Sequence, residues 1–247
     1  MPRFFLEVAY KGTQYSGFQI QENSNTIQAE VEKTFKILLR QSVDLTGSSR
    51  TDAGVHALQN YFHFDFSESL SDRIVYKMNA ILPDDIVVKG LYTMPENAHS
   101  RFDATSREYD YVLYQHKNPF LKGIAYYFPY TLDEKLLHEA AALVKSGTNF
   151  FAFSKTNTQV KNFNCKIYKS QWIHDHDKLI YNIEGNRFLR GMVRLLTASM
   201  LKVGRGKISL DEFASMFTYP DQKCGFSVPP DGLFLKRVKF PNSIIED

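Results

Sequence analysis

The sequence predicts an α+β fold in which helices cover one face of a largely antiparallel sheet. Segments with period-2 alternation alternate with segments of helical apolar spacing. Both halves of the chain order their strands and helices in a similar way, and its 247 residues suit one large domain or two closely associated halves. The boundary is expected near residues 98–106, which gives an N-terminal half of residues 1–103 and a C-terminal half of residues 104–247.

Composition limits the class of protein further. The hydrophobic fraction of 43% is sufficient for a core and lies far from that of disordered chains. No apolar run approaches the roughly 20 residues that a membrane span needs, and the N-terminus lacks the layout of a signal peptide. We therefore expect a cytoplasmic protein that does not associate with membranes. Cys165 and Cys224 have no metal-ligand spacing, so free thiols are expected.

In the first half, alternation and aromatic enrichment predict strands, and apolar residues three and four apart predict helices. Asn25, with Gln28 three residues later, is predicted to cap the first helix. Ile81 is expected to face the core from the second helix, which Pro83 ends. The predicted elements are strands at residues 3–10, 59–66 and 86–93 and helices at residues 26–40 and 71–82.

The second half repeats these patterns. Thr131 and Glu134 are predicted to form a capping box, and Gly147 follows the end of that helix. A short helix is expected to open at Ser209, with Glu212 three residues later. The predicted elements are strands at residues 107–115, 164–175, 178–185 and 233–240 and helices at residues 131–146 and 188–203.

The loop GSSRTDAGVHA, residues 47–57, concentrates chemistry in a short stretch. Residues two apart in extended backbone share one face, so Arg50 and Asp52 are expected to lie side by side. A guanidinium at that distance lowers the carboxylate pKa and keeps it ionised, as a nucleophile or general base requires. Gly47 and Gly54 allow sharp turns. The alternative interpretation is a surface ion pair in a turn.

Other chemistries find less support in the sequence. His56 has no second histidine or cysteine at ligand spacing. The turn at residues 174–177, which reads HDHD, is expected to be solvated rather than to bind a metal. The chain contains no G-x-S-x-G nucleophile elbow, no P-loop and no G-x-G-x-x-G motif. Acyl transfer and nucleotide-dependent reactions are therefore disfavoured.

Five further segments accompany the loop along the chain: YKGTQYSGFQIQ, NAILPDDI, RFDATSREYDYVLY, GNRFLRGMVRLLTASMLKVGRGKIS and PPDGLFLKRVKF. Together they resemble, in order, the motifs of the TruA family of tRNA pseudouridine synthases, whose signature loop reads G-[AS]-[GS]-R-T-D-A-G-V-H. The resemblance covers almost the whole chain. Two departures concern Phe18, where the family often has Trp, and the pair Arg190 and Gly191, where it often has an aromatic residue or histidine. Gly191 is expected in mid-helix, at a cost of about 1 kcal/mol relative to Ala.

The resemblance implies an isomerase that converts uridine to pseudouridine in the anticodon stem-loop of tRNA, at positions 38, 39 and 40. It implies no cofactor and no metal. The partners it implies are tRNA and a second copy of the chain in a homodimer. It also implies two ferredoxin-like halves that share one largely antiparallel mixed sheet, with helices on one face and a central active-site cleft.

Site residues follow from the matching motif positions. Asp52 matches the catalytic aspartate, which attacks ribose C1′, attacks base C6 or removes the C2′ proton; the sequence leaves all three open. Arg50 is implied to hold the target nucleotide open and to contact phosphate. Tyr109 is implied to stack on the flipped base. Tyr111 shares the strand face of Tyr109 and is expected to pack beside the pocket.

The long helix supplies the remaining catalytic candidate. Arg194 matches the family arginine that pairs with the catalytic aspartate. Arg187 and Arg190 are spaced to share one side of that helix with Arg194 and are candidates for phosphate contact, as is Arg107 on the strand of Tyr109. His56, at the end of the signature loop, is a candidate for substrate binding.

Two alternative functions are a non-catalytic RNA-binding module on the same fold and a hydrolase that uses Asp52 and His56. The net charge of +3 requires a local concentration of basic residues for RNA binding. The candidates are Lys11, Arg50, Arg107, Lys155, Lys161, Arg187, Arg190, Lys202, Arg205 and Lys207. Binding that weakens with salt is expected.

Overall fold

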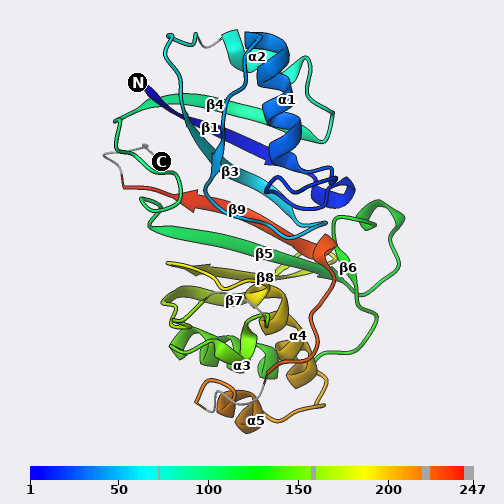
Figure 1. Cartoon of the computed structure of the whole chain (residues 1–247). Helices are drawn as coiled ribbons and strands as arrows, with labels where there is room; N and C mark the ends of the chain where they lie inside the picture. Colours follow the sequence, from blue (N-terminus) through cyan, green and yellow to red (C-terminus); the bar gives the residue numbers. More distant parts are fainter. Residues whose placement is uncertain (72, 157–159, 219–222, 242–247) are drawn as a thin grey trace. The chain divides into compact units, whose positions relative to one another are not determined.

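The computed structural model describes residues 1–71, 73–156, 160–218 and 223–241 (Figure 1). The chain divides into two compact units. The first unit comprises Met1–Thr105 together with the chain from Phe234 onward, and the second comprises Ser106–Leu233.

The first unit is an antiparallel sheet with one parallel pairing. Its strand order is β4-β1-β3-β9, in which β1 is antiparallel to β3 and β4, β3 is parallel to β9, and β2 pairs with β3. The helices α1 and α2 are neighbours on one face (Figure 1). The elements are β1 (Arg3–Tyr10), η1 (Gly12–Gln14), α1 (Ile27–Leu39), β2 (Thr46–Gly47), β3 (His56–Asp65), α2 (Arg73–Asn79), β4 (Ile86–Met94) and β9 (Leu233–Lys239).

Apolar spacing explains how the first two helices pack, and two predicted details are wrong. Phe35 of α1 packs against Phe64 of β3, with 5.0 Å between ring centroids. The N-cap of α1 is Thr26, whose side chain accepts a hydrogen bond from the Ala29 amide, rather than Asn25. Ile81 is 38% exposed because α2 ends at Asn79, before it reaches that position.

The second unit is an antiparallel sheet covered by helices. Its strand order is β5-β8-β7, with β6 parallel to β5. The helices α3 and α4 lie side by side, and α3 packs on β7. The elements are β5 (Ser106–Tyr114), η2 (Pro119–Leu121), β6 (Tyr126–Tyr127), α3 (Glu134–Ser146), η3 (Phe151–Phe153), β7 (Ile167–Asp175), β8 (Lys178–Gly185), α4 (Met192–Gly204), α5 (Leu210–Ser215) and η4 (Pro230–Gly232).

Of the two capping boxes predicted in the second unit, one is confirmed and one is wrong. The capping box of α5, formed by Ser209 and Glu212, is confirmed. The predicted box at Thr131 is wrong: Asp133 caps α3 by accepting a hydrogen bond from the Leu136 amide at 3.1 Å. Asp133 is two residues closer to the first helical turn than Thr131, where an acceptor side chain reaches the orphan amides.

The predicted α+β class with largely antiparallel strands is confirmed. The sequence-based division into residues 1–103 and 104–247 kept β9 with the second half. In the structure β9 belongs with the first unit from Phe234 onward, because it pairs with β3 through Phe234 and Leu235. Among the described helices, none combines the length and apolar character needed to cross a membrane.

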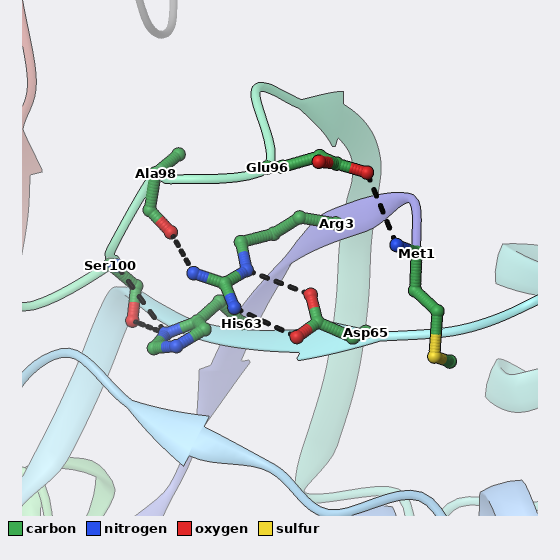
Figure 2. Close-up of polar contacts among 7 residues, drawn as sticks. All are labelled: Met1, Arg3, His63, Asp65, Glu96, Ala98 and Ser100. Atoms are coloured by element: carbon green, nitrogen blue, oxygen red, sulfur yellow. Dashed lines mark hydrogen bonds and ion pairs between the residues drawn. The ribbon is translucent and has the colours of Figure 1, made fainter.

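A polar cluster secures the N-terminal end of the first unit (Figure 2). Arg3 binds both carboxylate oxygens of Asp65 at 2.8 Å and also donates to the carbonyl of Ala98. His63 lies beside this pair, with its Nδ1 2.9 Å from the hydroxyl of Ser100. Burial lowers the pKa of His63 to about 4, and the nearby positive charges of His99 and Arg3 add to the effect.

This pKa shift predicts acid sensitivity of the fold. The unfolded chain takes up a proton at His63 near pH 6.5, whereas the folded chain does so only near pH 4. The contribution to stability is therefore complete above pH 6.5 and is lost as the pH falls towards 4. Between pH 7 and pH 5 we expect this residue to account for a loss of about 1–2 kcal/mol.

Urea unfolding at the two pH values checks this for the wild type and the variant His63→Asn, which keeps a hydrogen-bonding group but does not titrate. The variant should lose less stability on acidification. If both proteins show the same difference between pH 7 and pH 5, His63 is not the responsible group.

Candidate functional site

The loop at residues 47–56 lies in the first unit and is held by the N-terminal segment that follows β1. The Phe18 amide donates to the carbonyl of Thr51 at 3.1 Å, and the Gly54 amide donates to the carbonyl of Tyr15 at 3.3 Å. Within the loop, the Val55 amide donates to the carbonyl of Asp52 at 3.2 Å and closes a turn. The backbone is thus fixed on both sides of Asp52.

Buried polar side chains fix the other side of the loop. Asn60 of β3 is fully buried, and its amide group accepts a hydrogen bond from the Ser49 N–H and donates to the Ser49 carbonyl at 2.8 Å. The hydroxyl groups of Tyr10 and Thr51 lie 2.8 Å apart, and Asn60 also donates to Tyr10. Such buried networks favour a single arrangement of the backbone that they bind.

Two positions at the loop require glycine, one because of close backbone approach and the other because of a left-handed turn. At Gly12 an added Cβ would lie 2.0 Å from the Val55 carbonyl oxygen, so the two segments could not approach as they do. Gly54 has a φ of 78°, which is the left-handed region that glycine enters without steric cost. The small residues of the loop therefore serve its conformation.

Tyr15 connects the loop to the segment between α2 and β4. Its hydroxyl donates to the Asp85 carboxylate at 2.5 Å, while its carbonyl accepts from Gly54. Burial, together with this carboxylate, raises the pKa of Tyr15 well above the usual value, so the phenol stays protonated and continues to donate. The sequence did not identify Tyr15 or Asn60 as residues that support the loop. For Asn60, the available sequence signal is a polar residue within an aromatic-rich strand.

The predicted side-by-side ion pair of Arg50 and Asp52 is not formed. Arg50 is exposed, and its side chain has no hydrogen bond or ion pair among the residues that the structure describes. Asp52 is half-buried. The prediction assumed extended backbone, but residues 50–55 form a loop that is pulled towards Tyr15 and Phe18 and turns at Gly54.

His56 is placed as a support for the loop. Its side chain is 1% exposed, its Nδ1 accepts the Gly12 amide at 3.1 Å, and its ring stacks on Phe234 with 4.6 Å between centroids. An acceptor at Nδ1 puts the proton of the neutral imidazole on Nε2. The ring thus joins β3, β9 and the Gly12 turn, and substrate binding by His56 stays a prediction.

In the second unit, Tyr109 stands half-buried on β5, paired with Ile183 of β8. The ring of Phe188 meets the Tyr109 ring edge-on, with 5.1 Å between centroids and an interplanar angle of 81°. Tyr111 is fully buried and donates to the carbonyl of Pro229 at 2.9 Å, which confirms its interpretation as a packing residue. Burial raises its pKa far above the usual value.

Arg194 occupies the first turn of α4. Its Nε donates to the carbonyl of Val228 at 2.8 Å, and the Val228 amide approaches the Arg194 carbonyl at 3.4 Å. Arg107 lies on β5 and donates from Nη1 to the carbonyl of Asn186 at 3.1 Å. Both guanidinium groups are therefore oriented by backbone carbonyls.

The predicted arginine stripe on the long helix is wrong. The helix α4 begins at Met192, and Gly191 precedes it as N-cap with a left-handed φ of 73°. Arg187 and Arg190 therefore lie in an irregular segment, where helical spacing has no meaning. Arg190 is exposed, and its carbonyl accepts the Lys155 amide at 3.1 Å, which ties this segment to the chain after η3. Gly191 costs no helix propensity because it is outside the helix.

No group of three or more histidine, cysteine, aspartate or glutamate side chains suited to a metal occurs within residues 1–71, 73–156, 160–218 and 223–241. His174 is exposed and lies 3.1 Å from Glu134, and His176 occupies a turn with a φ of 55°. The basic loop at residues 155–161 is described only at its ends, since residues 157–159 lie outside the described residues.

The chain is similar to known proteins along its whole length. A family model described as tRNA pseudouridine synthase matches residues 141–241. The chain is 39% identical over 252 residues to a protein of Parabacteroides distasonis named tRNA pseudouridine synthase A, with 100% of each chain covered. It is 37% identical to a protein of the same name from Porphyromonas gingivalis, with 99% of each covered. For one from Staphylococcus aureus, the identity is 34%, with 99% of this chain and 94% of the relative covered.

The close approach at Gly12 generates a prediction about stability. Gly12→Ala should lower the free energy of unfolding by about 1–3 kcal/mol, because the added methyl group must displace the backbone at Val55. Urea unfolding measures the change.

The matched control is Gly225→Ala. Nothing lies within 4 Å of a Cβ built there, so this variant should change stability by less than about 0.5 kcal/mol. Equal unfolding free energies for the two variants would contradict the packing of Gly12 against the loop.

Proposed function

The chain belongs to the tRNA pseudouridine synthase A family, whose members are isomerases, and on this premise we propose that Asp52 catalyses the conversion of uridine to pseudouridine in the anticodon stem-loop of tRNA. The proposed targets are positions 38, 39 and 40. The reaction breaks the N-glycosidic bond, rejoins C1′ to C5 of the same base and moves the C5 proton to solvent while N1 gains one. Because substrate and product are isomers, the balance needs no redox partner.

The observation that carries the proposal is the placement of Asp52. Its backbone is fixed through Tyr15, Phe18 and Thr51, while the side chain itself is only half-buried. A carboxylate on a fixed loop pays little entropy on meeting a substrate, and orientation of this kind is a major source of rate acceleration. Attack at C1′, attack at C6 and removal of the C2′ proton all require this group.

Tyr109 suits the role of a platform for the flipped base. The target atoms C1′ and C5 are shielded in a stacked stem, so the nucleotide has to leave the helix before it reacts. The Tyr109 ring is half-buried and packs against Phe188 in a T-shaped pair, which restrains its orientation before a base stacks on it. Stacking of a base on an aromatic ring contributes about 1–3 kcal/mol.

The arginines suit anionic groups in different ways. Arg194 is oriented by Val228, and a fixed guanidinium is well matched to a carboxylate or a phosphate. Arg50 is exposed at the rim of the Asp52 loop, as a residue that holds a nucleotide open would be. We propose Arg107, Arg187 and Arg190 as phosphate contacts. The homodimer, the cytoplasmic location and the lack of a cofactor stay predictions from the family resemblance.

The central prediction concerns the Asp52 carboxylate. Asp52→Asn keeps the shape of the side chain but removes the charge, so kcat for pseudouridine formation should fall at least ~10³-fold. Pseudouridine in a tRNA transcript, quantified by mass spectrometry, measures the rate. The affinity for tRNA should change little, because the amide occupies the same volume.

Asp44→Asn is the control, since Asp44 is an exposed carboxylate shortly before the loop. It should retain full kcat. A rate for Asp52→Asn close to that of the control would refute the assignment of Asp52.

Site selection forms a separate prediction. Transcripts of one tRNA that carry a single uridine at position 38, 39 or 40 should each be converted, because a site that recognises shape and backbone can serve neighbouring nucleotides. A transcript without uridine at all three positions should give no product. Conversion confined to uridines outside the anticodon stem-loop would contradict the proposed specificity.

A further inference from the structure

We propose that Phe102, supported by His99 and flanked by Arg101, forms a stacking site for an unpaired nucleotide of the RNA substrate, a second contact remote from Asp52. This inference rests on the proposed function for its RNA ligand. The site lies within the first unit, in the segment between β4 and β5.

Exposure alone does not distinguish Phe102. Its side chain is 73% exposed, and that of Phe120 is 88% exposed. Single exposed apolar residues are common on protein surfaces. Phe120, however, has no ring or cation contact in the part of the chain that the structure describes, whereas the ring of Phe102 lies 4.2 Å from that of His99 between centroids, at an interplanar angle of 39°.

The same imidazole also fixes the backbone that carries Phe102. His99 Nδ1 accepts hydrogen bonds from the amides of Arg101, at 3.1 Å, and Phe102, at 3.4 Å. The His99 amide donates to the Asp103 carboxylate at 2.7 Å. The exposed ring is therefore attached to a closed turn and rests on the side chain that closes it.

A second histidine continues this support into the sheet. The His63 ring lies 4.4 Å from the His99 ring between centroids, and His63 is 6% exposed. Its Nδ1 is paired with the hydroxyl of Ser100 (Figure 2). The Ser100 hydroxyl in turn donates to the carbonyl of Thr46. The exposed phenyl ring is thus the outer member of a series that begins in β3. A ligand that stacks on it meets a group already in place, which lowers the entropic cost of binding.

The chemistry of the site favours a nucleotide over a protein partner. Every base has a π-face that stacks on an aromatic ring without regard to sequence. The Arg101 guanidinium carbon lies over the Phe102 ring, 5.7 Å from its centroid, so a cation accompanies the aromatic platform and is within reach of the phosphate of a nucleotide that binds there. A protein interface would call for a contiguous apolar patch, but the neighbours of this ring along the chain are Arg101 and Asp103.

The position of the site predicts which kinetic constant it affects. His63, beneath the ring series, and His56, beside the Asp52 loop, are seven residues apart on β3. At about 3.3 Å per residue this is about 23 Å. The stacked nucleotide is therefore not the one that reacts, and its loss should weaken tRNA binding without slowing the chemical step.

Phe102→Ala tests the proposal by tRNA affinity and steady-state kinetics. Removal of a stacking platform should raise Kd for a substrate tRNA transcript by roughly fivefold or more. KM should rise in parallel, and kcat at saturating tRNA should be retained. Phe102→Tyr keeps the ring and should restore Kd to the wild-type value. Phe120→Ala, the matched removal of an exposed phenyl group, should leave Kd unchanged.

The salt dependence separates the two halves of the site. Arg101→Gln should reduce the slope of log K against log salt concentration by about 0.7, the value for one phosphate contact to a single strand. Phe102→Ala should leave that slope at its wild-type value, because a phenyl group binds no counterion.

The proposal is overturned if Phe102→Ala and Phe120→Ala bind tRNA equally well, or if Phe102→Ala alters the sedimentation of the protein but not its tRNA affinity, which would indicate a protein partner. Thermal unfolding of Phe102→Ala shows whether this variant retains the fold. If it does not, the salt slope of Arg101→Gln decides, because an unchanged slope would contradict a phosphate contact beside the ring. A wild-type protein that binds tRNA but forms no pseudouridine would refute the proposed function and leave the Kd comparison intact.

Discussion

The attachment of one loop to its neighbours is the constraint on which the site depends. Residues 51–55 exchange backbone hydrogen bonds with Tyr15 and Phe18, and the side chain of Asn60 holds Ser49 from the sheet side. An exposed loop without such contacts would sample many conformations, and each fixed residue costs about 1–2 kcal/mol of conformational free energy. The fold bears this cost when the first unit forms, so that Asp52 is already oriented.

The polar residues around this loop are explained by the same requirement. His56 and Asn60 are buried, yet each binds backbone groups of the N-terminal turns or the loop. Tyr15 adds a bond to Asp85, which joins the loop to the segment before β4. Buried polar groups of this kind are stable only when they are satisfied. Their placement therefore links the integrity of the first unit to the geometry of the proposed catalytic carboxylate.

Local pattern was sufficient to predict most elements, because alternation and apolar spacing are properties of short segments. The prediction failed where contacts between segments distant in the sequence determine where an element begins or which strand it pairs with. The start of α4 at Met192 depends on the left-handed turn at Gly191, and helical spacing predicted a longer helix and a false alignment of Arg187 and Arg190. The parallel pairing of β9 with β3 joins segments almost 180 residues apart, which no local pattern records.

The residues of the candidate site were likewise predicted only in part. The family motif points to Asp52, whose catalytic role stays a prediction, but spacing alone gave an ion pair with Arg50 that the loop conformation does not form. Substrate binding by His56 also stays a prediction, and its ring is buried against Phe234. The error over the ion pair arises from treating a loop as a set of side chains, whereas its backbone hydrogen bonds decide which side chains face the solvent.

The structure of the Asp52→Asn variant bound to a substrate tRNA tests the role of Asp52 most directly. If Asp52 is the catalytic group, the target uridine is everted and the side-chain oxygen at position 52 lies within about 3.5 Å of C1′, C6 or C2′ of that nucleotide. The atom that is nearest would also distinguish the three chemical routes. A uridine still stacked in the stem, or one everted next to a different carboxylate, would contradict the central claim.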